Sequence, residues 1–252
     1  MKILGSFIVC LVLCQSISWA DQNNGGVDRP FVVIELFGSE GCSSCPPADE
    51  ILRSWTAAAK TQGKNIFTLS FHVDYWNYLG WVDPFSSPRF TKRQHAYAKA
   101  LKRSSVYTPQ MIINGTNAFV GSDKRLVEQY VAQYLRMPPE NQITITLGDE
   151  TDPKHIKVLY SYREWTVDAV VNIALVEGGL ESQVTNGEND GQLLKHENVV
   201  REFTTVPLVQ KEGMVLMPKP TGDDLSRFSV IVYLQRTSDM KILAAGSIGL
   251  LK

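Results

Sequence analysis

Cysteine is scarce in this sequence: four stand among 252 residues, at positions 10, 14, 42 and 45. A secreted domain held together by disulfides spreads several cysteines along its length, so the sequence excludes that class of scaffold. Cys42 and Cys45 are so close that a disulfide between them would restrict the unfolded chain little. The pair therefore indicates a chemical role, with an inert disulfide as the alternative.

An excess of either charge is also missing. Lys and Arg together number 25 and Asp and Glu 26, which gives a formal net charge of −1. The basic residues are scattered among acidic ones, and this excludes the basic surface with which proteins bind nucleic acids. After residue 20, no apolar run reaches the roughly 20 residues of a transmembrane helix, so no stable membrane insertion is expected there.

Residues 1–20 have the pattern of a signal peptide. Lys2 precedes an apolar run over residues 3–13, and the sequence S-W-A at residues 18–20 is a small-x-small cleavage pattern. An uncleaved anchor and a lipidated cysteine are the alternatives; the run is short for a bilayer, and neither early cysteine follows a small residue. We expect cleavage and a periplasmic or secreted location, which leaves the close pair as the remaining cysteines.

Strand and helix patterns alternate over residues 31–140, after a polar linker at residues 21–30. Pro46 and Pro47 fit only the opening turn of a helix. A β-α-β half followed by a hairpin and a helix is the order of a thioredoxin-like domain, so the fold class is predicted to be α/β. The expected elements are a strand at 31–37, a helix at 42–62, a strand at 66–73, a helix from Ser87 to about 101, a hairpin turning at Asn114-Gly115, and a helix capped by Ser122 that ends near 136.

The pattern changes to short apolar segments over residues 141–252. They are separated by turn-forming clusters and show little helical periodicity, which predicts an all-β, sandwich-like second domain. The boundary is expected near residues 138–141, where the composition and the period both change. The expected strands lie at 143–147, 156–162, 167–176, 199–209, 228–234 and 242–250.

A C-x-x-C pair at the start of a helix is typical of a redox centre. Unpaired backbone N–H groups and the helix dipole stabilise a thiolate on the first cysteine. Cys42 is therefore predicted to be the nucleophile that attacks a disulfide, and Cys45 the residue that resolves the mixed disulfide. The expected partners are protein thiols or disulfides, and no cofactor is required.

The same cysteines leave a metal site open as an alternative. Half of a zinc or copper site could be formed by Cys42 and Cys45, and the sequence has no second cysteine pair to complete it. His72 stands at the end of the second predicted strand, and the carboxyl ends of parallel strands should lie at the same edge of the sheet as the cysteines. In this alternative, the protein is a metal-handling module whose metal ligands are Cys42, Cys45 and His72.

Two further groups are candidates for the site. Glu35 is a carboxylate inside an apolar strand, and burial there could raise its pKa and let it transfer a proton for Cys45. His72, Asp74 and Trp76 belong to an aromatic and polar block expected at the rim of the site. They are predicted to bind substrate, with a packed cluster that only shields the site as the alternative.

Three segments together resemble the family of secreted bacterial proteins called domain of unknown function 1223. They are residues 35–49 (ELFGSEGCSSCPPAD), 71–76 (FHVDYW) and 107–110 (YTPQ). The resemblance covers nearly all of the chain after the signal peptide. It implies a thioredoxin-like domain followed by a β domain, and an exported location such as the periplasm. Residues 187–191 and 194–201 also look like family segments, which we interpret as turn and strand structure.

Thr108 and Pro109 occupy the place where thioredoxin-like proteins carry a cis-proline beside the C-x-x-C pair. The resemblance therefore implies a cis Thr108–Pro109 bond, which sequence statistics alone would not favour. Such a proline would leave the backbone of Thr108 free to pair with an extended substrate segment. An ordinary proline at the start of a strand is the alternative.

Overall fold

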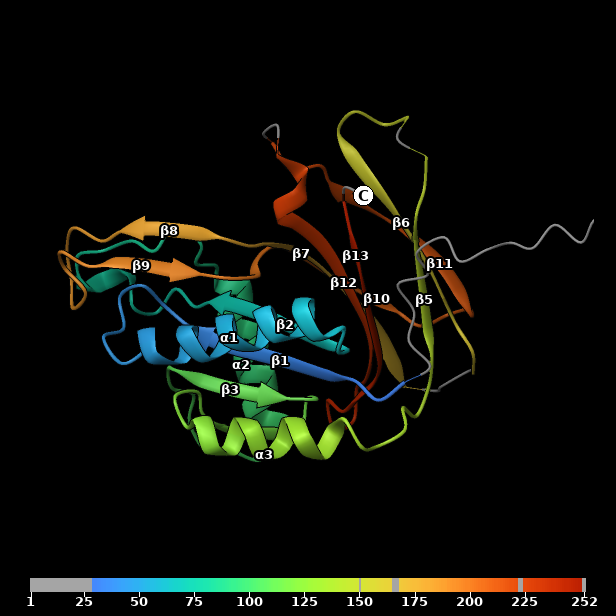
Figure 1. The fold of residues 1–252 in the computed structure, drawn as a ribbon, viewed down its shortest axis with the longest axis horizontal. Coiled ribbons are helices and arrows are strands. Elements are labelled where there is room, and N and C mark those ends of the chain that lie inside the picture. The colour runs from blue at the N-terminus through green and yellow to red at the C-terminus, as the bar shows by residue number, and fades with distance from the viewer. Residues whose placement is uncertain (1–28, 150, 165–167, 222–223, 251–252) are drawn as a thin grey trace, which may run out of the picture.

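The computed structural model describes residues 29–149, 151–164, 168–221 and 224–250. The predicted signal peptide at residues 1–20 and most of the linker at residues 21–30 lie outside this part of the chain. The described residues form a mixed α/β structure with one large sheet, a three-stranded sheet and a two-stranded hairpin (Figure 1).

The large sheet has eight strands in the order β13-β12-β7-β10-β2-β1-β3-β4. β1 pairs in parallel with β2 on one side and antiparallel with β3 on the other. Both central strands are buried along their whole length, as a nearly continuous apolar sequence requires. The bounds of the eight strands are β1 Val32–Gly38, β2 Ile66–His72, β3 Gln110–Ile113, β4 Asn117–Val120, β7 Ala169–Glu177, β10 Val199–Pro207, β12 Phe228–Arg236 and β13 Ile242–Gly249.

Helix α1 (Pro46–Gln62) begins later than the sequence pattern suggested. Cys45 is its N-cap residue, and the cysteine pair lies in the turn that precedes it. Pro46 and Pro47 occupy the first turn, where a missing N–H costs nothing. Gly63 ends the helix in the left-handed conformation that glycine tolerates best.

Two further helices flank the same strands. α2 (Pro88–Ala100) is capped as expected, since the Ser87 hydroxyl accepts a hydrogen bond from the Arg89 N–H. α3 (Lys124–Tyr134) is capped by Asp123 instead of the predicted Ser122, and the Asp123 carboxylate accepts from the Leu126 N–H. α1 and α3 share one apolar cluster with β1 and β3, whereas α2 belongs to the cluster on the opposite face.

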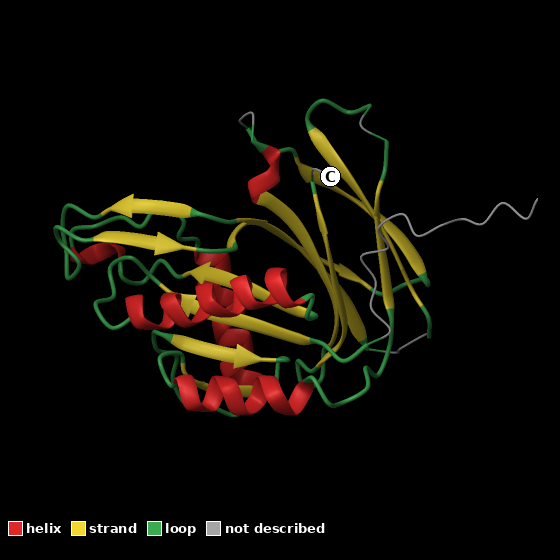
Figure 2. Cartoon of the chain, viewed as in Figure 1, coloured by secondary structure: helices red, strands yellow, loops and turns green. Residues whose placement is uncertain are grey.

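Residues after Ile143 form strands and one 3-10 turn, within the part of this region that is described (Figure 2). The three-stranded sheet has the order β11-β6-β5, and its apolar side chains pack with those of β7, β12 and β13 in one cluster. β8 and β9 form the separate hairpin. The expected strands did not include β8 and β11, and β9 was covered only by the interpretation of residues 187–191 and 194–201 as turn and strand structure. The bounds are β5 Ile143–Leu147, β6 His155–Tyr162, β8 Leu180–Gln183, β9 Leu193–His196 and β11 Glu212–Pro218.

The eight-stranded sheet crosses the boundary expected near residues 138–141. β10 lies parallel to β2, with Val199 opposite Ser70, and the Ser70 N–H donates to the Asn198 carbonyl over 2.9 Å. Strands from both sides of that boundary therefore share one sheet. None of the helices in the described ranges has the length and apolar character needed to cross a membrane.

Candidate functional site

Cys42 and Cys45 form a disulfide immediately before α1. Their Cα atoms lie 5.5 Å apart, and the Cys45 N–H donates to the Cys42 carbonyl over 3.1 Å, which closes a tight turn. Cys45 already has helical backbone angles as the N-cap residue. Cys42 is 0% exposed and Cys45 1%, so both sulfur atoms are covered.

The Thr108–Pro109 peptide bond is cis, as the resemblance implied. Gly121, just after β4, shows where this proline lies. A Cβ atom added at Gly121 would be 3.2 Å from the Ala48 Cβ and 3.3 Å from the Pro109 Cβ, and the Gly121 N–H donates to the Pro109 carbonyl over 2.9 Å. Pro109 therefore lies beside the first turn of α1, and the lack of a side chain at Gly121 permits this approach.

Trp76 connects this proline segment with the cysteine turn. Its indole N–H donates to the Thr108 hydroxyl over 2.8 Å. A Cβ atom at Gly41, the residue before Cys42, would come within 3.1 Å of the Trp76 Cβ. The structure thus brings together Trp76, Thr108, Pro109 and the disulfide, all of which the sequence pointed to.

Glu35 lies away from the disulfide, and its expected role in proton transfer is corrected. The side chain is on the α2 face of β1, while α1 and Cys45 are on the other face. Arg93 donates to its carboxylate through Nε over 2.8 Å, Tyr233 donates over 2.9 Å, and Tyr97 also donates. Burial lowers the pKa of Arg93, but the charge of Glu35 together with Tyr233, Tyr97 and the hydrogen bond to Glu35 outweighs burial and raises it. Glu35 is therefore the anion of a buried ion pair.

His72 does not form with Trp76 the substrate platform that was expected from the sequence. His72 is 2% exposed, too little for contact with a substrate, and its Nδ1 atom lies 2.7 Å from an Asp83 carboxylate oxygen. Burial raises the pKa of Asp83, but the charge and hydrogen bond of His72 reverse this and lower it. Asp74 accepts a hydrogen bond from the Thr91 hydroxyl on α2 over 2.5 Å. Trp76 is the member of this predicted trio that reaches the cysteine turn.

A buried polar cluster beside the cysteine turn was missed by the sequence analysis. Glu40 is 0% exposed, and one carboxylate oxygen accepts from the Trp81 indole N–H over 2.8 Å. The other lies 3.1 Å from Nε2 of His196, on β9. The Nδ1 atom of His196 lies 3.7 Å from the Asp49 carboxylate on α1. Burial lowers the pKa of His196, but the interactions with the Asp49 and Glu40 carboxylates together outweigh burial and raise it to about 10.

The loop of the β8–β9 hairpin is hydrogen-bonded to the cysteine turn. In the connecting loop, the Glu188 carboxylate accepts hydrogen bonds from the backbone N–H and the hydroxyl of Ser43, over 3.0 and 2.7 Å. The Asn189 side chain donates to the carbonyls of Glu40 and Cys42, over 2.8 and 3.1 Å. β9 also lies against α1 (Figure 1). The glycines of residues 187–191 signalled this turn, but nothing in the sequence indicated what the turn would cover.

Comparison with known proteins assigns the chain to a family. A family model described as a protein of unknown function (DUF1223) matches residues 33–235. The chain belongs to the DUF1223 family. This DUF1223 chain is also similar to the crystal structure of protein AGR_C_4864 from Agrobacterium tumefaciens, with 29% identity, a TM-score of 0.63, and coverage of 91% of this chain and 95% of that one. A comparison with curated proteins finds no match.

The metal alternative receives no support from the side-chain arrangement of this DUF1223 protein. Within the described ranges, no group of three or more His, Cys, Asp or Glu side chains is arranged to hold a metal ion. Cys42 and Cys45 are bonded to each other, and His72 is paired with Asp83. The three proposed metal ligands therefore contact other groups and do not converge on one point.

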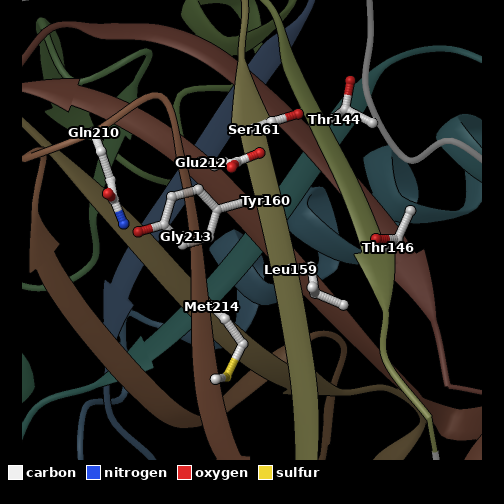
Figure 3. A pocket seen from close by; sticks show the side chains of 9 residues that line it. All are labelled: Thr144, Thr146, Leu159, Tyr160, Ser161, Gln210, Glu212, Gly213 and Met214. Atoms are coloured by element: carbon white, nitrogen blue, oxygen red, sulfur yellow. The ribbon is translucent and has the colours of Figure 1, made fainter.

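A pocket also lies on the three-stranded sheet, apart from the cysteine turn (Figure 3). It includes exposed apolar side chains such as Met214, which is 53% exposed. None of its lining residues is a site residue predicted from the sequence. They are Thr144, Thr146, Leu159, Tyr160, Ser161, Gln210, Glu212, Gly213 and Met214.

Proposed function

We propose that this protein is an exported thiol-disulfide oxidoreductase, in which Cys42 and Cys45 alternate between dithiol and disulfide. The observation that carries the proposal is the disulfide at the N-terminus of α1 with the cis Pro109 segment beside it. The N-terminus of a helix favours a thiolate, because its backbone N–H groups lack helical partners and the dipole is positive there. This is the environment in which cysteine pairs exchange disulfides.

The arrangement of residues 31–140 supports a thioredoxin-like interpretation of the fold. The strand order β2-β1-β3-β4, with β3 antiparallel to β1, follows from a β-α-β unit and a hairpin. α1 and α3 pack on one face of these strands and α2 on the other. In such a fold, the cysteine pair at the start of the first helix and the cis-proline lie side by side, and here Pro109 and Ala48 in the first turn of α1 both lie close to Gly121.

The exchange reaction proceeds in two steps. The Cys42 thiolate attacks a substrate disulfide, forms a mixed disulfide and releases one substrate thiolate. Cys45 then attacks the Cys42 sulfur, which forms the internal disulfide and releases the second thiolate. Two electrons pass from the protein to the substrate, and the reverse sequence oxidises a substrate dithiol.

Proteins with thiols or disulfides are the partners that this chemistry requires. The buried sulfurs must become accessible before such a partner can react, because Cys42 is 0% exposed. The loop that holds Glu188 and Asn189 is the part of the cover contributed by the β8–β9 hairpin. The signal-peptide pattern of residues 1–20 supports action outside the cytoplasm, where disulfides persist.

A redox titration tests the proposal. Protein lacking residues 1–20 is equilibrated in glutathione buffers, and the disulfide fraction is measured by thiol alkylation and mass spectrometry. We expect a reversible two-electron transition, with a potential near −120 mV for an oxidant or near −270 mV for a reductant. The Cys42→Ser variant is the matched control and should show no internal disulfide. A wild-type protein that stays oxidised or reduced through the whole range would contradict the proposal.

A further inference from the structure

Resolution of a mixed disulfide requires that Cys45 lose a proton, and this inference rests on the proposed exchange function. The carboxylate first expected to take that proton, Glu35, is on the opposite face of β1 and bound to Arg93. The acceptor must therefore be another group near the first turn of α1.

Asp49 is placed beside Cys45 by the geometry of the helix. Cys45 has helical backbone angles, and the Asp49 N–H donates to the Cys45 carbonyl over 3.1 Å. Residues four apart on a helix lie on the same face, one turn from each other, with Cβ atoms about 5–6 Å apart. The side chain of Asp49 is 13% exposed, so most of it is shielded from water.

His196 holds the carboxylate of Asp49 from the other side. Its side chain is 1% exposed, and its Nδ1 atom, 3.7 Å from the Asp49 oxygen, has no hydrogen-bond partner. The cation is retained below about pH 10, because the two neighbouring carboxylates raise the pKa of His196 despite burial. This buried nitrogen has no hydrogen-bond partner and faces Asp49, which is a second observation that points to Asp49 as a functional group of the site.

The charged groups around this pair come from several elements. Glu40, in the loop before α1, contacts Nε2 of His196. The His72 ring on β2 lies 4.8 Å from that of His196, centroid to centroid, and is paired with Asp83. Next to His196 on the hairpin, Glu197 is paired with Lys60 over 2.8 Å. Glu197 has its own basic partner in Lys60, and Glu40 is bound by both His196 and the Trp81 indole, which leaves Asp49, four residues after Cys45, as the acid nearest to Cys45 along the chain.

We propose that Asp49 is the proton acceptor for Cys45 during resolution, and that His196 is a positioning residue that holds Asp49 there. The Cys45 thiol transfers its proton to the Asp49 carboxylate. The resulting thiolate attacks the Cys42 sulfur of the mixed disulfide, forms the Cys42–Cys45 bond and releases the substrate thiolate. In the reverse direction, Asp49 returns the proton to the Cys45 thiolate as the internal disulfide opens.

The two steps can be measured separately with an aromatic disulfide that releases a coloured thiolate, dithiobis(nitrobenzoate). Reduced protein releases one coloured thiolate when Cys42 attacks and a second when Cys45 resolves. We expect Asp49→Asn to leave the first phase unchanged and to slow the second about 100-fold near pH 7, a typical loss for a missing general base. The difference should narrow above about pH 8.5, where a thiol ionises without help.

Matched variants separate chemistry from structure. Asp49→Glu keeps a carboxylate and should restore much of the rate, and His196→Gln should slow the second phase less than Asp49→Asn. Glu50→Gln, at a neighbouring side chain that is 65% exposed, should match wild type. A slow second phase in Asp49→Asn that does not recover at high pH would indicate misplacement and overturn the inference.

If folded Asp49→Asn has the same second phase as wild type, the role of Asp49 as proton acceptor is overturned. The exchange function still stands in that case, provided that the wild-type protein shows both phases. Release of no coloured thiolate by the reduced wild-type protein would instead contradict the exchange function itself. If circular dichroism shows that Asp49→Asn does not fold, the Asp49→Glu and His196→Gln variants test the role of Asp49 instead. Resolution rates and pH profiles equal to wild type in both would overturn the inference.

Discussion

Glu188 places a negative charge on the first spacer residue of the C-x-x-C motif. Its carboxylate accepts from both the N–H and the hydroxyl of Ser43, and the backbone hydrogen bond is the main reason that the pKa of Glu188 is lowered. The N–H groups at this end of a helix are the ones that stabilise a thiolate on the first cysteine. Glu188 therefore competes with the Cys42 thiolate for a hydrogen-bond donor and also repels it.

We predict that Glu188→Gln makes the disulfide a stronger oxidant. Removal of the charge should favour the Cys42 thiolate, lower the pKa of that thiol in the reduced protein and raise the reduction potential. The shift should be small, because Glu188 is exposed and solvent screens its charge. The glutathione titration measures the potential, and the pH dependence of alkylation measures the pKa.

Glu181→Gln is the control for this change. Glu181 lies on β8 of the same hairpin and pairs with Lys195 over 2.9 Å, without contact to the cysteine turn. Its potential should equal that of the wild type. A potential for Glu188→Gln that is unchanged or more negative would show that Glu188 does not oppose the thiolate.

At the scale of elements, the β8–β9 hairpin contacts the cysteine turn through its connecting loop. Asn189 is 1% exposed and bridges two carbonyls of the cysteine turn, those of Glu40 and Cys42. Gly187 and Gly191 have φ angles of +79° and +78°, which allow the loop to turn back over the motif. The two Asn189 hydrogen bonds therefore hold the cover in place.

We predict that Asn189→Ala opens this cover. Two lost hydrogen bonds at about 1 kcal/mol each should raise the open fraction, and with it the rate of disulfide reduction by a small phosphine, by about tenfold or more. Asn186→Ala, at an exposed position of the same loop, should leave the rate unchanged. Equal rates for Asn189→Ala and wild type would mean that the loop does not limit access.

Local signals in the sequence predicted many of the elements correctly. Pro46 and Pro47 lie in the opening turn of α1 although the helix begins later than expected, Ser87 caps α2, and Asn114-Gly115 turns the β3–β4 hairpin with positive φ at both residues. Each of these signals acts over a few residues, because each restricts the backbone conformation of its own segment. The C-x-x-C pair is also a local signal, whereas the place of Pro109 beside it was implied by the family resemblance, because the two segments lie far apart in the chain.

The rest of the site could not be predicted, because its contacts join distant parts of the chain. Glu188 contacts Ser43 across 145 positions, and His196 contacts Glu40 across 156. Residues 187–191 and 194–201 indicated only a turn and a strand. The pairing of β10 with β2 decides where the hairpin lies, and no periodicity in either strand specifies that pairing.

At the scale of the whole molecule, a buried ionic network joins the two halves of the chain. Glu35 on β1 and Arg93 on α2 contact each other and Tyr233 on β12. Glu35 and Tyr233 are fully buried. Removal of one partner from a buried ion pair leaves the other charge without compensation, which costs more than the pair contributes.

We predict that Glu35→Ala lowers the free energy of unfolding by about 3–5 kcal/mol, because it leaves the Arg93 charge unpaired. Urea unfolding followed by circular dichroism measures the change. Glu35→Gln, which keeps hydrogen-bonding atoms but removes the charge, should cost less. Glu128→Ala is the control, since that side chain is 56% exposed on α3 and should change stability by less than about 0.5 kcal/mol. A similar midpoint for Glu35→Ala and Glu128→Ala would contradict this account.

Burial of both sulfur atoms has a consequence for how fast the oxidised protein can respond to its surroundings. When a bond is reached only after its cover opens, its rate of reduction stops rising once the reductant is concentrated enough to capture every opening. Fast and slow reductants then converge on one limit, the opening rate of the hairpin. Under these conditions the fold sets the lifetime of the disulfide, because reduction waits for the cover to open. A brief pulse of thiol then leaves most molecules oxidised.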